Sequence, residues 1–256
     1  MSTYLAGEGP VAIAHRGGSL EAPENSRAAV EHTLALGLRY FETDVRTTRD
    51  GVAVLFHDPT VERVTGTSGA VEHLSWEELS RLRDASGSPP LRLEELLGDY
   101  PDLRVNIDAK DEASIAPVVA ALHATRALDR VCVTSFDDAR VHVLRTALGP
   151  QVATGLGRRG VARLLAASRL PARAARTVAA ESLHAACVQV PPTYLGLPVV
   201  TGPFVETAHR LGLAVHVWTI DEPAEMRRLL DLGVDGLVTD RPSVLKTVLD
   251  SRGPWH

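Results

Sequence analysis

The chain has 256 residues, of which 45% are hydrophobic and 23% charged, and its formal net charge at pH 7 is −5. These values are ordinary for a globular enzyme and exclude fibrous, low-complexity and strongly basic nucleic-acid-binding proteins. Because no long apolar stretch and no signal-peptide pattern occurs, we expect a single cytoplasmic domain over residues 1–256 without stable membrane insertion.

Strand and helix patterns alternate along the chain. Apolar runs rich in β-branched and aromatic residues predict eight strands, near residues 11–16, 40–47, 103–109, 130–136, 152–156, 186–191, 214–220 and 235–239. Helical patterns lie between them, as at 26–36, 115–125, 139–148 and 224–232. Alternating units predict an α/β fold with a parallel sheet, and eight of them predict a closed (β/α)8 TIM barrel. A doubly wound open sheet is the alternative.

One stretch departs from this alternation. A short apolar run at 52–56 ends in His57-Asp58, and the segment of about residues 59–90 that follows is too long for a plain strand-to-helix loop. We therefore expect a small insertion after the second strand, with a short helix near 76–83. Long loops of this kind are usually functional, so we expect an excursion over the barrel mouth.

Charged side chains appear where predicted strands end. His15 and Arg16 follow the first apolar strand, and Glu42 and Asp44 lie two apart on the next, so that both carboxylates point to one face. Asp108 ends the following barrel strand. The C-terminal strand ends of a barrel share one mouth, where active sites lie. Three carboxylates there suit a hard divalent cation, so we expect Mg²⁺ or Ca²⁺ held by Glu42, Asp44 and Asp108.

Two histidines, His15 and His57, each follow an apolar strand. Near pH 7 one imidazole can remove a proton while the other delivers one to a leaving oxygen. Arg16 and Lys110 are suited to hold a phosphoryl group through charge-assisted hydrogen bonds. Lys110 is notable because the chain has only two lysines. These residues predict acid–base chemistry on a phosphate ester, and they leave open which histidine is the acid.

Short motifs with a common order and spacing run through nearly the whole chain. They are HRGG at 15–18, APENS at 22–26, ExD at 42–44, FHD at 56–58, NIDAK at 106–110, SF at 135–136, VWT at 217–219 and GVDGLVTDRP at 233–242. In this series the chain resembles the glycerophosphodiester phosphodiesterase family. The resemblance implies a TIM barrel with a small insertion, and metal-dependent hydrolysis of small-molecule glycerophosphodiesters to glycerol 3-phosphate and an alcohol.

The resemblance also implies a role for each matching residue. These are the metal ligands Glu42, Asp44 and Asp108, the acid–base pair His15 and His57, the phosphate contacts Arg16 and Lys110, and the glycerol contact Trp218. The family often has Glu where this chain has Asp108, and the shorter side chain would alter metal distance or preference. The alcohol, the choice between Mg²⁺ and Ca²⁺ and the oligomeric state stay open.

Three other functions are compatible with parts of this sequence. A lysophospholipase D or phospholipase-D-type enzyme would use the same barrel on a lipid phosphodiester, and an apolar mouth would favour it, but the insertion is more polar than lipid binding needs. A non-catalytic phosphate-binding barrel would keep the pocket, although the intact His15 and His57 argue against it. An amidohydrolase would want a His-x-His pair on the first strand, where this chain has His-Arg-Gly.

Overall fold

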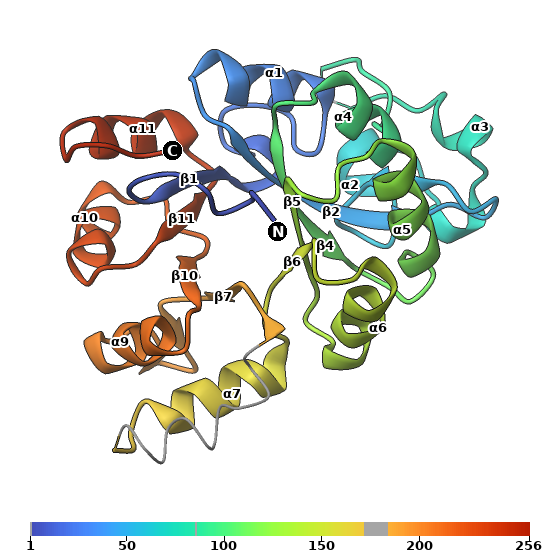
Figure 1. Cartoon of the computed structure of the whole chain (residues 1–256). Coiled ribbons are helices and arrows are strands. Elements are labelled where there is room, and N and C mark those ends of the chain that lie inside the picture. Colours follow the sequence, from blue (N-terminus) through green and yellow to red (C-terminus); the bar gives the residue numbers. More distant parts are fainter. Residues whose placement is uncertain (1, 85, 172–183) are drawn as a thin grey trace.

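The computed structural model describes residues 2–84, 86–171 and 184–256. Within these ranges eight parallel strands form a nearly closed barrel (Figure 1). In order around the barrel they are β6 (Ala153–Thr154), β5 (Val131–Thr134), β4 (Arg104–Ala109), β2 (Tyr40–Thr47), β1 (Val11–Ala14), β11 (Gly236–Thr239), β10 (Ala214–Val217) and β7 (Cys187–Val190). The predicted TIM barrel is confirmed, and the open sheet is wrong.

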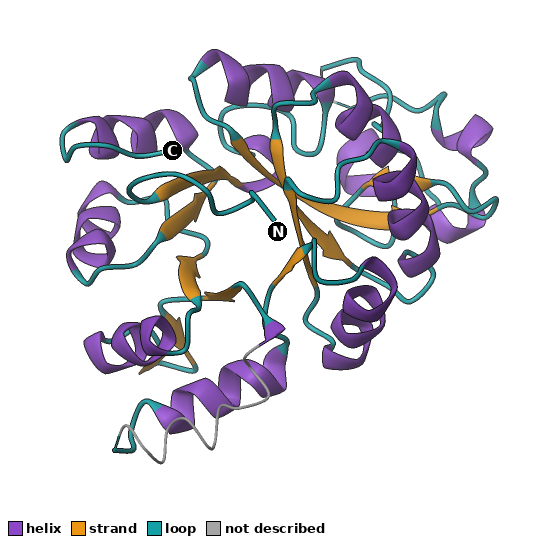
Figure 2. Cartoon of the chain, viewed as in Figure 1, coloured by secondary structure: helices purple, strands orange, loops and turns teal. Residues whose placement is uncertain are grey.

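Helices surround the strands, as Figure 2 shows. They are α1 (Arg27–Ala35), α4 (Leu93–Asp99), α5 (Ile115–Ala124), α6 (Asp138–Leu148), α7 (Arg158–Ala167), α9 (Gly202–Arg210), α10 (Pro223–Asp231) and α11 (Pro242–Asp250). In the parts of the chain that the structure describes, no helix is both long enough and apolar enough to cross a lipid bilayer.

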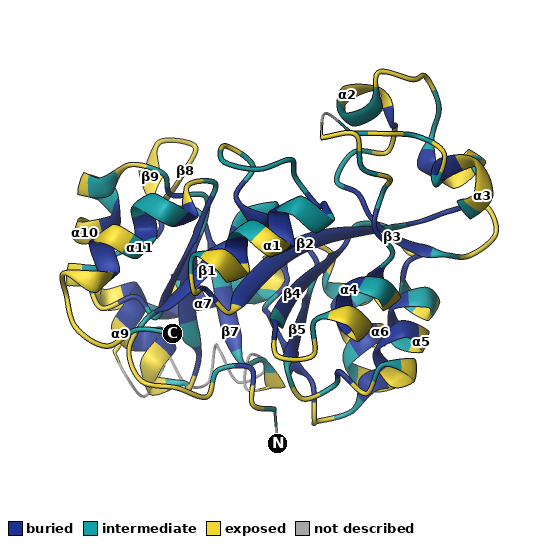
Figure 3. Ribbon diagram, turned by 90° about the horizontal axis from the view of Figure 1, so that it is seen from above, coloured by how far each residue is buried: buried dark blue, intermediate teal, exposed yellow. Residues whose placement is uncertain are grey.

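Each strand is buried on both faces, which explains why the strands read as continuous apolar runs. On β1, Val11 and Ile13 pack in one cluster with residues of β5, β7 and β11, whereas Ala12 and Ala14 pack in another with residues of the outer helices. Figure 3 shows the strands as buried and the outer faces of the helices as exposed. This double burial fixes the strand register that positions the side chains at the mouth.

The barrel closes weakly between its two end strands, β6 and β7. A single parallel bridge joins Gly155 to Cys187 there, and the Leu156 N–H donates to the Cys187 carbonyl. By contrast, β2 and β4 pair along a continuous register from Tyr40 opposite Arg104 to Val45 opposite Ala109. Strand pairing in the barrel is therefore least extensive between β6 and β7.

The insertion after β2 lies to one side of the barrel (Figure 3). It begins with β3 (Ala53–Leu55), antiparallel to the end of β2, and continues through α2 (Glu62–Thr65) and α3 (Trp76–Leu79). Its apolar side chains form a cluster of their own around Val61. None of its described residues within 59–90 lines the cavity at the barrel mouth. The expected excursion over the mouth is thus wrong for the part that the structure describes.

Candidate active site

A cavity of about 610 Å³ opens at the carboxyl ends of the barrel strands. The residues singled out from the sequence all line it: His15, Arg16, Glu42, Asp44, His57, Asp108, Lys110 and Trp218. Strand register explains this convergence, because parallel pairing sets Asp44 opposite Asp108 and Glu42 opposite Asn106. The side chains of alternate residues on these neighbouring strands then point into one space.

The predicted strand over 11–16 ends early, at Ala14, and His15–Gly17 form a 3-10 turn, η1. Arg16 and Gly17 have φ values of 51° and 85°, which an extended strand does not allow. A Cβ on Gly17 would lie 2.4 Å from the Ala29 Cβ and 2.5 Å from the Phe41 ring, so only glycine fits. The turn directs the Arg16 backbone N–H to Glu42, at 3.1 Å.

Lys110 lies between the two aspartates. Its Nζ is 2.6 Å from Asp44 Oδ1 and 2.6 Å from Asp108 Oδ2. Burial raises the pKa of Asp44, but the charges of Lys110 and Arg16, whose Nε is 3.0 Å from Asp44 Oδ2, outweigh it and hold that pKa below 3.8. For Asp108 burial prevails over Lys110, and the pKa is raised.

Of the three carboxylates, Glu42 is the one whose negative charge is least compensated by neighbouring cations. It is buried, and its Oε2 lies 3.8 Å from His15 Nε2. Burial, and after it the charge of Asp44, raises the pKa of Glu42 to about 7. In the described ranges no three His, Cys, Asp or Glu side chains are gathered as a metal-binding set. The cation between Asp44 and Asp108 is instead the Lys110 ammonium.

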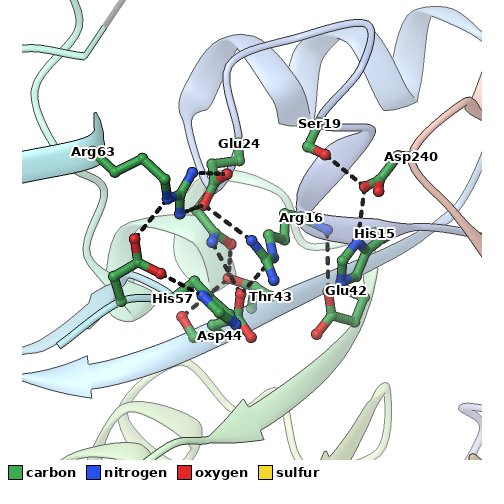
Figure 4. A network of polar contacts seen from close by, with 12 residues as sticks. His15, Arg16, Ser19, Glu24, Glu42, Thr43, Asp44, His57, Arg63 and Asp240 are labelled. Carbon is green, nitrogen blue, oxygen red and sulfur yellow. Dashed lines mark hydrogen bonds and ion pairs between the residues drawn. The ribbon is translucent and has the colours of Figure 1, made fainter. Parts of the chain in front are cut away.

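His15 is oriented from across the β1–β11 pair. Its Nδ1 is 2.7 Å from Asp240 Oδ1, to which the Ser19 hydroxyl also donates at 2.6 Å (Figure 4). Burial lowers the pKa of His15, but the hydrogen bond to Asp240 and the charge of Glu42 outweigh it and raise the pKa above 6.5. Burial raises the pKa of Asp240, but His15, Ser19 and Arg16 together outweigh it and lower the pKa below 3.8.

His57 is oriented by its neighbour in sequence. Its Nδ1 is 2.6 Å from Asp58 Oδ1, and Arg63 Nε donates to Asp58 Oδ2 at 2.6 Å. Arg63 also makes a bidentate contact with Glu24, at 2.7 and 2.8 Å (Figure 4). The hydrogen bond from Arg63, and after it the one from His57, lowers the pKa of Asp58 to about 2.

Sequence reasoning gave no role to Asp240, Arg63 or Glu24. Asp240 had a usable signal, since it follows the last barrel strand as His15 follows the first, and β1 and β11 are neighbours. Arg63 had none, because it lies in the insertion, where no regular pattern places its side chain.

Trp218 also lines the cavity and lies just after β10. Its ring meets that of Phe136 edge to face, with centroids 5.7 Å apart and planes at 85°. Fold and site together define a TIM barrel whose mouth carries two histidines, each held by a carboxylate, and the cations Arg16 and Lys110, a combination suited to binding an anionic ester.

Comparison with known proteins agrees with this class. Residues 15–244 match the model of the Glycerophosphoryl diester phosphodiesterase family. A probable glycerophosphodiester phosphodiesterase 2 of Mycobacterium tuberculosis is 40% identical over 98% of this chain and 95% of that protein. A glycerophosphodiester phosphodiesterase of Caldanaerobacter subterraneus is 30% identical over 94% of this chain and 98% of that protein.

Solved structures give the same answer. A phosphodiesterase of Oleispira antarctica, in complex with the product sn-glycerol-3-phosphate, matches with a TM-score of 0.78 at 25% identity, over 94% of this chain and 97% of that one. A putative glycerophosphoryl diester phosphodiesterase of Silicibacter pomeroyi matches with a TM-score of 0.79 at 25% identity, over 99% and 98%. The chain belongs to the glycerophosphoryl diester phosphodiesterase family and is a phosphoric diester hydrolase, as the sequence motifs predicted.

Proposed function

We propose that the chain hydrolyses small-molecule glycerophosphodiesters to glycerol 3-phosphate and an alcohol, with His15 and His57 as the acid–base pair. The observation that carries this proposal is that both imidazoles line one cavity with Nδ1 held by a carboxylate, Asp240 or Asp58. A carboxylate at Nδ1 fixes the tautomer and leaves Nε2 for the reacting groups. The product found in the Oleispira antarctica structure supports the choice of substrate.

Arg16 and Lys110 would bind the phosphate. Both now lie against Asp44, at 3.0 and 2.6 Å. A phosphodiester entering the cavity offers these cations a second anion, and their charge-assisted hydrogen bonds would offset negative charge on its non-bridging oxygens as the reaction proceeds. Trp218 would form the wall beside the glycerol.

The two histidines would carry out the proton transfers of the reaction. One Nε2 takes the proton of the attacking oxygen, which belongs to water or to the neighbouring glycerol hydroxyl, while a new P–O bond forms. The other Nε2 delivers a proton to the alcohol oxygen as its bond to phosphorus breaks. With water as the attacking group, this step adds the elements of water to the substrate and gives glycerol 3-phosphate. With the glycerol hydroxyl it gives a cyclic phosphate, which water would open in a second step with the two histidines in reversed roles. In either case both histidines return to their starting states over the full cycle.

Glu42, Asp44 and Asp108 would hold a divalent cation, although the described structure does not gather them as a ligand set. Their carboxylate oxygens are the donors that Mg²⁺ and Ca²⁺ prefer, and at buried Glu42 the charges of His15 and Lys110 do not offset burial and Asp44, which raise its pKa. When bound, such a cation polarises a phosphoryl oxygen. Lys110 would then release the two aspartates, and its ammonium would become available to the phosphate.

A substrate panel tests the proposal. Release of glycerol 3-phosphate is measured with glycerophosphocholine, glycerophosphoethanolamine and glycerophosphoglycerol, with and without EDTA, and after Mg²⁺ or Ca²⁺ is returned. We expect turnover that EDTA removes and one of the two cations restores. No release from any substrate under either cation would contradict the activity and favour a phosphate-binding barrel. Full turnover in EDTA would contradict the metal requirement alone.

A further inference from the structure

One side of the cavity is apolar. Away from the histidines, the cavity is lined by Leu156, Val161, Leu165, Val190, Tyr194 and Val199, which we call the apolar wall. Val161 and Leu165 lie on α7, Leu156 follows β6, and Val190 ends β7. Tyr194 and Val199 belong to the segment that follows β7. The same cavity holds Lys110 and both histidines, so the wall and the proposed phosphate site are continuous.

The shortness of β6 and its limited pairing with β7 explain why side chains of α7 reach the cavity. The strand β6 has only two residues, Ala153–Thr154, and meets β7 through one bridge. Val161 and Leu165, four residues apart, lie on one face of α7. In most of the barrel such a face packs against strands, but here both side chains line the cavity and stay only partly buried. A helix face that would ordinarily belong to the core has become part of the binding surface.

Charge on this side argues against a cationic group. Among the described residues from 155 to 199 that line the cavity, only Arg158 is charged, and its guanidinium carbon lies 5.2 Å from the centre of the Phe136 ring. The Lys110 ammonium lies 6.0 Å from the same ring. Because two cations already make cation–π contacts with this ring, a choline-type ammonium group would not bind favourably to it as a third. The wall therefore suits an uncharged, apolar group.

Apolar surface continues from the wall to the rim. A hairpin of β8 (Thr193–Tyr194) and β9 (Leu197–Pro198) rises at the edge of the barrel (Figure 3). Tyr194, Leu195 and Leu197 are 67%, 85% and 67% exposed. The positive φ values of Leu195 and Gly196, 49° and 75°, are those of a two-residue hairpin loop. The hairpin holds three exposed apolar side chains beside the cavity, which suits contact with an apolar ligand.

We propose that the apolar wall binds a single hydrocarbon chain carried by the phosphodiester substrate. This inference rests on the proposed function, and the bond broken and the protons moved are the same. The chain would run from the phosphate at Lys110 past Phe136 and along the wall to Tyr194. The polarity of the insertion does not oppose this substrate class, because none of its described residues within 59–90 lines the cavity.

Substrate series test the proposal. We would measure kcat/KM below the critical micelle concentration for glycerophosphocholine and for two series of rising chain length. In one series, short-chain lysophosphatidylcholines, the chain is on the glycerol; in the other, glycerophospho-n-alkanols, it is on the leaving alcohol. We expect kcat/KM to rise with length in at least one series, by up to about fourfold for each methylene that the wall buries.

The series also separate the two possible failures. A rise in the first series places the chain on the glycerol side, and a rise in the second places it on the alcohol side. If glycerophosphocholine is cleaved and neither series rises, the hydrocarbon-chain proposal is overturned while the proposed function stands. If no substrate is cleaved, the proposed function itself fails.

Variants locate the effect on the wall. Val161→Gln and Leu165→Gln are compared with Val143→Gln on α6 and Leu34→Gln on α1, whose side chains are exposed and do not line the cavity. The readout is the ratio of kcat/KM for the eight-carbon member of the series in which kcat/KM rises to that for glycerophosphocholine. We expect the wall variants to lower this ratio by about tenfold or more and the controls to keep it.

A ratio that stays constant while both substrates slow equally would show only structural damage and overturn the proposal. Leu195→Ser avoids that ambiguity, because this side chain lies outside the core. We expect Leu195→Ser to reduce the gain from the longest chains alone, and an unchanged gain at every length would exclude the hairpin from the binding surface.

Discussion

His15 and His57 both present Nδ1 to a carboxylate, but the carboxylates belong to different parts of the fold. Asp240 approaches His15 from the neighbouring strand of the barrel, 225 residues away in sequence. Asp58 is the next residue to His57 and is held by Arg63 from the insertion. The side chain of His15 is 18% exposed and that of His57 is 36% exposed.

The same imidazole geometry therefore has two kinds of support. The barrel framework orients His15, since β1 and β11 are paired in register up to Ala14 and Thr239. A surface network of Arg63, Asp58 and Glu24 orients His57. None of the described residues of the insertion within 59–90 lines the cavity, but the insertion supports the site because Arg63 holds Asp58 in place. We expect the orientation of His15 to depend less on salt than that of His57. We also expect it to be more sensitive to mutation of a buried residue.

The largest effect is expected from removing either imidazole. We expect His15→Ala and His57→Ala each to lower kcat by about 10²–10⁴-fold or more, because each loses one proton transfer. The kcat for glycerophosphocholine is measured together with the circular dichroism spectrum, which should not change. Full activity in either variant would refute the acid–base assignment for that residue.

A smaller loss is expected when the supporting carboxylates are neutralised. Asp240→Asn and Asp58→Asn should each lower kcat by about tenfold to a hundredfold, through loss of the correct tautomer and orientation. We expect the larger loss in Asp240→Asn, whose pH–rate profile should shift toward lower pH on the limb that reports His15. Equal losses and unshifted profiles would remove the distinction between the two supports.

The His15–Asp240 pair should also make stability depend on pH. The pKa of His15 is raised above 6.5, so its contribution is complete below pH 6.5 and is lost as pH rises through the folded value. The pKa of Asp240 is lowered below 3.8, so its contribution is complete above pH 3.8 and is lost on acidification through the folded value.

The difference in unfolding free energy between the natural protein and Asp240→Asn should therefore be largest between these limits. We expect about 1.5–3 kcal/mol at pH 5.5, typical of a hydrogen bond between charged groups, and less at pH 9. Urea unfolding at both pH values measures it. A difference that grows toward pH 9 would contradict the raised pKa of His15.

The smallest effect is expected from Arg63→Met. Arg63 is about half exposed, and exposed ion pairs contribute about 0–1 kcal/mol, so kcat should fall only a few-fold. High salt should bring the natural protein closer to the variant. Arg81→Met, which removes an exposed ion pair with Glu77 elsewhere in the insertion, is the matched control and should leave kcat unchanged. A loss of kcat as large as in Asp58→Asn would mean that Arg63 matters for the orientation of His57 as much as Asp58 itself does.

The site was predictable where it depends on strand ends. Glu42, Asp44 and Asp108 could be placed together because the side-chain alternation of strands and the shared mouth of a barrel are general. The partner of His15 was missed although Asp240 follows the last barrel strand, which lies beside the first in a closed barrel. The apolar wall was missed because the sequence carries no such signal for it. Val161 and Leu165 look like ordinary core positions of a helix, and only the short β6 strand exposes them to the cavity.

The position of Lys110, 2.6 Å from both Asp44 and Asp108, has a consequence for metal affinity. The Lys110 ammonium is thus a counter-ion of both acids. An ammonium and a divalent cation cannot occupy the same oxygens, so loading of the proposed cation would be an exchange between an internal ligand and an external one. We expect Lys110→Met to bind the divalent cation more tightly, measured by isothermal titration calorimetry, because the resident competitor is gone.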